Sequence, residues 1–283
     1  MGEFVLTEAM VAARRASARC LSDGRKASLD EEAARYVDER GFAPIMRLRG
    51  CDLPSLSEAD VREPWQGFDI TDGAWRWKEV LPEQRRCAYG RFLLNRGFFI
   101  SWRLFPAFYR LYGHFADESK GTEQRTAREE YADGLLGRLE WLVLETIAER
   151  GPVDSRLLWQ EVKRAFGGDR SRFERALVAL QAGFRVMVAG GSLEGWSMHR
   201  WDLVERQAPA ALLGQLPGTD EARRALCLQY AANSVVCTVR EVAAFFRWDL
   251  HTAAAVAAEL TAAGLLRETK VEGWKGTWLS TAT

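Results

Sequence analysis

The sequence has no excess of charge of either sign. Lysine and arginine together number 39, and so do aspartate and glutamate, which makes the formal net charge zero. A protein that binds nucleic acid nonspecifically usually carries a clear positive excess, because phosphate contacts dominate its affinity. The composition argues against a chain that is basic throughout, so any surface for nucleic acid has to be local.

Cysteine and histidine are scarce. The cysteines are scattered, odd in number and without a C-x-x-C pair, and the histidines are His114, His199 and His251. This pattern indicates reduced thiols in a cytosolic protein rather than a disulfide framework, a zinc site or a histidine-rich metal centre. We therefore predict no metal and no cofactor. The cysteines are Cys20, Cys51, Cys87, Cys227 and Cys237.

Targeting segments and long apolar runs are missing as well. The N-terminus shows no apolar segment before a small-residue cleavage site, so we expect no signal peptide. No uninterrupted apolar run approaches the roughly 20 residues that span a bilayer. We expect a cytoplasmic protein without membrane contact.

The common catalytic motifs are absent. The sequence contains no G-x-S-x-G, Walker A, G-x-G-x-x-G or H-E-x-x-H. The glycine-rich "AGGSLEG" (189–195) precedes a strand-like segment, which predicts a turn between two strands rather than a phosphate loop. Cys87 has two arginines beside it but no histidine close in sequence, and we expect a buried thiol. These observations favour a protein that is not an enzyme.

What the sequence does have is a region that mixes aromatic residues with arginines, residues 73–113. Tyr89, Phe92 and Leu93 recur at helical spacing, as do Leu104, Phe108 and Leu111. We predict helices here, the first starting near Pro82, with a buried apolar stripe and arginines beside it rather than a platform for stacking bases. Trp75 and Trp77 alternate with cations, which predicts a strand.

The chain before this region predicts two helices and a short extended segment. Thr7 can cap a helix over residues 8–21. Ser28 and Glu31 form a capping-box pattern at the start of a second helix, which Gly41 would end. The apolar residues that follow predict a strand or an extended turn.

From residue 137 onward the sequence predicts the same order of elements twice. Each copy reads as three helices followed by a β-hairpin, the order of a winged helix. We therefore predict a mostly helical α+β protein with an N-terminal helical domain and tandem winged-helix units. The expected divisions are residues 1–118 for the N-terminal domain, 119–136 for a charged connector, 137–215 for the first unit and 216–283 for the second.

The third helix of the first unit is the predicted DNA-binding element, because that helix of a winged helix enters the major groove. Cations gather at its N-terminal half, just upstream of it and in the predicted wing. A solvated helix face with ion pairs between neighbouring turns is the alternative. The predicted DNA-binding residues are Lys163, Arg164, Arg170, Arg172, Arg175, Arg185, His199 and Arg200.

The corresponding helix of the second unit, "HTAAAVAAELTAAG", is nearly bare of cations. Because the alanine side chain is small, another surface can approach closely, but it offers no charged or polar group to bind phosphate. We expect this unit to serve as a packing module, or as an interface with a protein partner or a second copy of the chain.

Three segments resemble the AlkZ-like (YcaQ-type) winged-helix proteins, and more specifically their shorter AlkZ-related branch. They are "YVDERGFAPIMRLRGCDLPSL", "WRWKEVLPEQRRCAYGRFL" and "SRFERALVALQAGFRVMVAGGSLEGWSMHRWDLVERQAP". The resemblance implies tandem winged helices related to bacterial DNA glycosylases. It also implies a catalytic Gln-x-Gln or Gln-x-Asp motif, whose polar positions would fall on Pro44 and Met46 in this chain.

Because proline and methionine cannot place a water or stabilise a sugar cation, the sequence predicts binding of duplex DNA without glycosylase activity. Two alternatives stay open. One is an active glycosylase for alkylated or crosslinked bases that uses other residues. The other is a noncatalytic protein-interaction scaffold or transcriptional regulator, which the zero net charge and the alanine-rich helix favour.

Overall fold

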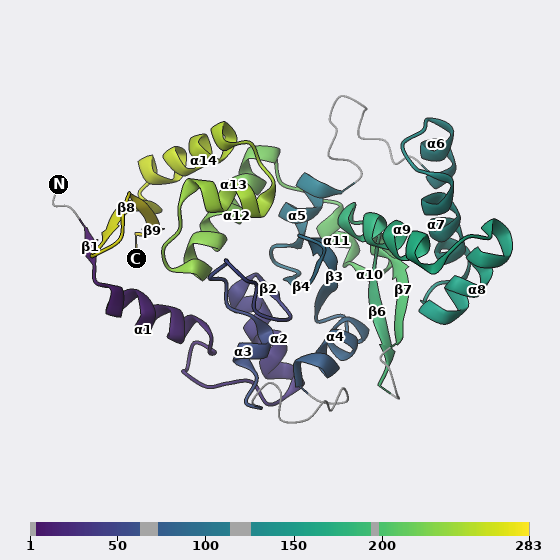
Figure 1. The fold of residues 1–283 in the computed structure, drawn as a ribbon, viewed down its shortest axis with the longest axis horizontal. Helices are drawn as coiled ribbons and strands as arrows, with labels where there is room; N and C mark the ends of the chain where they lie inside the picture. Colours follow the sequence, from purple (N-terminus) through teal and green to yellow (C-terminus); the bar gives the residue numbers. More distant parts are fainter. Residues whose placement is uncertain (1–3, 63–72, 114–125, 194–197, 283) are drawn as a thin grey trace.

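The computed structural model describes residues 4–62, 73–113, 126–193 and 198–282. Helices dominate, and the strands form three small sheets of three strands each (Figure 1). The predicted mostly helical α+β class is confirmed. Among the described residues no helix is long and apolar enough to cross a membrane.

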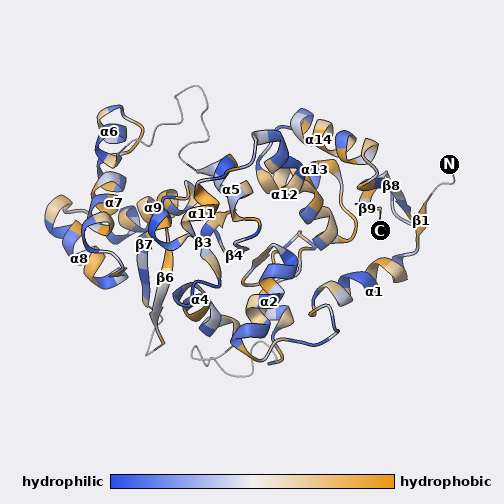
Figure 2. Ribbon diagram, turned by 180° about the vertical axis from the view of Figure 1, so that it is seen from behind, coloured by the Kyte–Doolittle hydropathy of each residue, from blue (hydrophilic) through white to orange (hydrophobic). Residues whose placement is uncertain are grey.

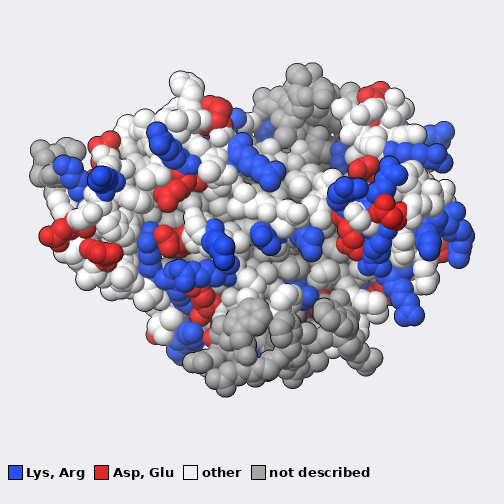
Figure 3. Space-filling view, in the orientation of Figure 1, with Lys and Arg blue, Asp and Glu red and all other residues white. Residues whose placement is uncertain are grey.

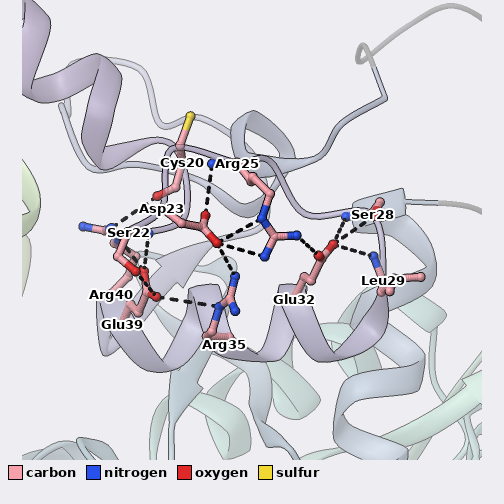
Figure 4. Close-up of polar contacts among 10 residues, drawn as sticks. All are labelled: Cys20, Ser22, Asp23, Arg25, Ser28, Leu29, Glu32, Arg35, Glu39 and Arg40. Carbon is pink, nitrogen blue, oxygen red and sulfur yellow. Dashed lines mark hydrogen bonds and ion pairs between the residues drawn. The ribbon is translucent and has the colours of Figure 1, made fainter.

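The first two helices begin as the sequence predicts, with one shift. Thr7 caps α1 (Glu8–Ala18), because its hydroxyl accepts from the backbone N–H of Met10 at 3.1 Å. At α2 (Asp30–Arg40) the carboxylate that accepts from Ser28 belongs to Glu32 and not to Glu31, and Arg25 also donates to it (Figure 4). These bonds hold the pKa of Glu32 at about 2, the backbone N–H of Ser28 contributing most.

A β-sheet lies where part of the aromatic region was expected to be helical. Strands β2 (Phe42–Pro44), β4 (Arg96–Ser101) and β3 (Cys87–Leu93) pair antiparallel in that order. Leu94 and Asn95, both with positive φ, join β3 to β4 in a two-residue turn. The predicted helix from Pro82 is therefore wrong, because this turn lets residues 87–101 pair as a hairpin instead.

The two tryptophans of the same region lie on a helix rather than on a strand. Helix α4 (Gly73–Glu83) contains Trp75 and Trp77, and Pro82 lies in its last turn. The predicted helix around Phe108 is confirmed as α5 (Phe105–Tyr112). The short α3 (Leu56–Ala59) precedes α4.

The first repeated unit has the predicted order of helices and strands. Three helices precede the β6–β7 hairpin, and the short β5 adds a third strand in the order β5-β7-β6. Ala189–Ser192 of the glycine-rich segment continue strand β6 rather than form the expected turn; residues 194–197 lie outside the described part. The elements are α7 (Arg138–Arg150), β5 (Val153–Asp154), α8 (Ser155–Phe166), α9 (Arg170–Ala182), β6 (Val186–Ser192) and β7 (Met198–Leu203).

The second unit repeats this order and shares its sheet with the N-terminus. Strand β1 (Val5–Leu6) pairs parallel with β8, giving the order β1-β8-β9. The winged-helix assignment of both units stays a prediction. The elements are α12 (Thr219–Ser234), α13 (Val239–Phe246), α14 (Leu250–Ala262), β8 (Leu266–Val271) and β9 (Trp278–Thr281).

Short helices join these parts. Of the predicted connector, residues 119–125 lie outside the described part, and α6 (Ala127–Ala132) occupies most of the rest. Helices α10 (Val204–Gln207) and α11 (Ala210–Leu213) lead from the first unit to the second. The division of the chain into domains stays a prediction.

The cores run across the predicted divisions of the chain. One cluster joins Phe42 of β2 and Phe108 of α5 to Phe245 of α13, and another joins Trp77 of α4 to Phe173 of α9. Figure 2 shows apolar residues along the helices and strands of all parts of the chain. The prediction that the aromatic region is core is confirmed, and Cys87 is buried as expected. Burial raises the pKa of its thiol far above the ordinary value.

Candidate nucleic-acid interface

A cleft of about 910 Å³ lies between the N-terminal part and the first repeated unit. One side consists of residues that follow β2, together with α4 and the β3–β4 hairpin. Residues of α8, α9 and β7 form the other side. Concave sites of this size at the meeting of two parts of a chain are common binding sites.

The cleft is rich in cations although the chain as a whole is neutral. Glu174 is the one acid among the described residues that line it, and its carboxylate pairs with Arg170 at 2.8 Å. Cations in a cleft with low-dielectric walls raise the local potential and attract anions. All the lining cations except Lys78 are exposed: Arg47, Arg49, Lys78, Arg91, Arg96, Arg156 and Arg170.

The surface elsewhere shows a different charge pattern. In Figure 3, Lys and Arg side chains lie across the middle of the face shown, whereas over α7–α9 at the right they alternate with Asp and Glu. Ion pairs explain part of this, since Arg150 of α7 and Arg164 of α8 both contact Glu161 of α8. The mixed surface at the right matches the alternative of a solvated helix face with ion pairs.

Two of the eight predicted DNA-binding residues line the cleft, namely Arg170 and His199. Lys163 and Arg164 are exposed on α8, and Arg172 and Arg175 on α9, but none of the four lines the cleft. Lys163 stands 5.9 Å from the ring of Trp159, and Arg172 stands 5.7 Å from that of Phe166. The predicted set is therefore divided between the cleft and the outer face of the first unit.

The last two predicted DNA-binding residues, Arg185 and Arg200, form ion pairs with glutamates. The guanidinium of Arg185 is 13% exposed and pairs with the buried Glu130, so its charge is directed into the protein. Arg200 pairs with Glu83 at the end of α4. Arg185 is for this reason left out of the proposed DNA surface.

A buried carboxylate lies beside the cleft between two of its lining residues. One oxygen of Glu79 lies 2.9 Å from Nδ1 of His199, and the other lies 3.7 Å from Nζ of Lys78. Glu79 is fully buried, while Lys78 and His199 reach the cleft. Lys78 also lies over the ring of Trp75, 4.4 Å from its centroid.

The glycines of β6 explain how α4 comes so close to the hairpin of the first unit. A Cβ on Gly191 would lie 2.3 Å from a Glu79 oxygen and 2.6 Å from the backbone oxygen of Met198. A Cβ on Gly190 would lie 2.9 Å from Glu83. The glycine-rich segment therefore permits a close approach of helix and strand.

The N-terminal part contributes cations to the cleft that were not among the predicted DNA-binding residues. Arg91 and Arg96 lie on either side of the two-residue turn at Leu94 and Asn95, and Asn95 is the residue type that favours such a turn. A predicted hairpin at this position would have placed both arginines at its tip. For Arg47 and Arg49 the sequence gave a weaker indication of a cationic site, namely their position shortly after the apolar strand β2.

The two positions that correspond to the implied catalytic motif differ in location. Pro44 is buried in the sheet opposite Phe98, whereas Met46 lines the cleft. Neither side chain can donate a hydrogen bond or act as a base, and the thioether of methionine is only a weak acceptor, so neither fits hydrolysis of a glycosidic bond.

Comparisons with known proteins agree with the resemblance seen in the sequence. A comparison with curated proteins gave no match. The fold is similar to that of the Streptomyces sahachiroi DNA glycosylase AlkZ, with a TM-score of 0.56 and 15% identity, covering 98% of this chain and 70% of that one. The sequence matches the family described as AlkZ related over residues 29–246. Because that match spans well over half of the chain, the protein belongs to the AlkZ-related family.

Proposed function

We propose that this protein binds duplex DNA along the cation-lined cleft, in the setting of DNA repair, without glycosylase activity through the positions of Pro44 and Met46. The main observation in support is that cations strongly outnumber acids in the cleft, although the chain as a whole has no net charge. Phosphate contacts by arginine supply most of the affinity of such a surface.

The element order of the first unit supports duplex rather than single-stranded DNA. Helix α9 comes third in the order of helices expected for a winged helix, and its Arg170 lines the same cleft as Arg91 and Arg96. The repair setting is supported by the AlkZ-related family and by the fold similarity to a DNA glycosylase. The second unit lies outside this surface, since none of its described residues lines the cleft.

Fluorescence anisotropy with a labelled duplex, measured over a salt series, tests this function. The variant Arg91→Gln/Arg96→Gln removes two cations from the cleft, and Arg150→Gln/Arg164→Gln removes two from the ion-paired outer face. If both cleft arginines contact phosphate, the log–log salt slope falls in magnitude by about 1.8 in the first variant.

The outer-face variant is the matched control, because it makes the same change in net charge. We expect its salt slope to equal that of the unaltered protein. Equal binding by all three proteins would overturn the cleft as the DNA site, and no binding even at low salt would favour the scaffold alternative. A single strand of the same sequence, used as competitor, separates duplex from single-strand binding.

A further inference from the structure

The group formed by Lys78, Glu79 and His199 is poorly placed to bind phosphate, because its lysine is mostly buried. A lysine for that purpose would be exposed, whereas the side chain of Lys78 is 9% exposed and stacked on Trp75. Yet Lys78 lines the cleft, and so does His199, which contacts the other oxygen of the same carboxylate. The combination is unusual in a structural ion pair and suits covalent chemistry.

We propose that Lys78 is an amine nucleophile that forms an imine with the aldehyde of an abasic site in DNA, and that His199 takes the proton in the strand cleavage that follows. This activity rests on the proposed function, because DNA has to occupy the cleft. Its substrate is an aldehyde at a ring-opened deoxyribose, so a base-removal reaction has to precede it.

The surroundings of Lys78 favour the neutral amine that can attack a carbonyl. Burial disfavours the ammonium form and lowers the pKa of Lys78, and this effect exceeds the opposing one of Glu79. Arg91 in the same cleft acts in the same direction. The ring of Trp75 covers one side of the amine. Desolvation of a lysine among such neighbours is a recognised way to make it nucleophilic.

The surroundings of His199 fix which of its nitrogens can act as a base. Its Nδ1 lies 2.9 Å from Glu79, so the carboxylate favours a proton on that nitrogen and leaves Nε2 to accept one. The rings of Tyr89 and Trp201 pack against the imidazole, with centroids at 6.1 and 5.3 Å. Glu79 is thus a positioning residue for both partners.

The reaction balances without any further reactant. Nζ of Lys78 attacks C1′ of the open-chain aldehyde, and water leaves to give the protonated imine. His199 then removes a proton from C2′, and the C3′–O bond breaks, so that the 3′ phosphate departs by β-elimination. Water finally hydrolyses the imine, which regenerates the amine and releases an unsaturated aldehyde end.

Borohydride trapping on a duplex with one abasic site tests the imine directly. Reduction converts the imine into a stable amine, which links the protein to the labelled strand and slows its migration in a denaturing gel. We expect a crosslink that peptide mapping assigns to Lys78, and its loss by at least about 10-fold in Lys78→Arg, which keeps the charge.

The two other residues affect a different step. In His199→Gln we expect the crosslink to persist while strand cleavage slows by about 100-fold, the usual range for loss of a general base. Glu79→Gln should retain the crosslink and alter the pH profile of cleavage, a readout that a merely structural role would not move. Circular dichroism and thermal unfolding check that each variant is folded.

Further measurements keep the failure of this proposal separate from that of DNA binding. A duplex with a tetrahydrofuran abasic analogue, which has no aldehyde, measures binding alone. Binding of this duplex without any trapping on the true abasic site would overturn the imine and leave DNA binding intact. Trapping at another lysine, such as the exposed Lys163, would overturn it equally.

The amine can also be examined without DNA. Glycolaldehyde with cyanoborohydride near neutral pH should label Lys78 in the unaltered protein before the exposed Lys26 and Lys163. Labelling of Lys78 slower than theirs would contradict a reactive amine, whether or not the protein binds DNA.

Discussion

The two repeated units have the same order of helices and strands but present different surfaces. Helix α9 of the first unit carries Arg170, Arg172 and Arg175 on its exposed side. Helix α14 of the second holds the same place, and its exposed side is mostly alanine beside Glu259, which pairs with Arg224 of α12. Two units with the same order of helices and strands can therefore carry different residues on their exposed surfaces.

What each unit packs against differs too. The first unit meets α4 and the β3–β4 hairpin, and the cleft lies between them. The second unit meets α5 and the sheet, with Phe245 5.6 Å from Phe42 and Phe246 6.3 Å from Phe108 between ring centroids. One unit therefore forms a wall of a polar cleft, and the other completes an aromatic core.

The largest effect should come from breaking that aromatic core. Phe246 is fully buried among aromatic rings, so Phe246→Ala should lower the free energy of unfolding by about 3–5 kcal/mol. Phe166 of the first unit is partly exposed, and Phe166→Ala should cost about 1 kcal/mol. Urea unfolding followed by tryptophan fluorescence measures both, and similar losses would contradict the contrast between the units.

The close approach of α4 to β6 should show an intermediate effect. Gly191→Ala places a methyl group 2.6 Å from a backbone oxygen, which we expect to cost about 1–3 kcal/mol of unfolding free energy. Gly218, before α12, has open space around it and an ordinary φ of −63°, so Gly218→Ala should cost a few tenths of a kcal/mol. Equal stability of the two variants in urea would show that the packing of α4 against β6 does not require a glycine at position 191.

The difference in surface can be measured as DNA affinity. Arg170 and Arg224 are both ion-paired with a glutamate, at 2.8 and 3.0 Å, but Arg170 lines the cleft. Arg170→Ala should reduce the magnitude of the log–log salt slope by about 0.9, and Arg224→Ala should leave it unchanged. A slope that falls in both variants would mean that the second unit also contacts phosphate.

The smallest effect should lie outside both units, at the start of α2. The pKa of Glu32 is about 2 in the folded chain, below its ordinary value of 4.5. The ionised carboxylate therefore stabilises the fold above about pH 4.5, and this stabilisation is lost as the pH falls from there toward 2. In Glu32→Gln the unfolding free energy should vary less with pH across this window. Thermal unfolding from pH 2 to 7 measures the difference, and an unchanged pH dependence would contradict the assigned bonds.

The sequence predicted helices best where caps and spacing agreed. Thr7 and Gly41 mark the start of α1 and the end of α2 correctly, because capping depends on residues a few positions apart. The hairpin at Leu94 and Asn95 was missed because its apolar residues fit a helical spacing equally well over one turn. The β-sheet partner of that hairpin, Phe42–Pro44, lies more than 40 residues away in the chain.

Four features of the protein follow from the amino-acid sequence alone: the α+β class, the repeated order of elements, the burial of the aromatic region and the contrast between α9 and α14. All of these depend on local spacing and side-chain type. Tertiary packing places Arg91 and Arg96 in the same cleft as Arg170, and it places Glu79 between Lys78 and His199. Arg170 lies 74 positions after Arg96, and His199 lies 120 positions after Glu79. Packing of α4 and β3–β4 against the first unit brings these residues together, which no local pattern encodes.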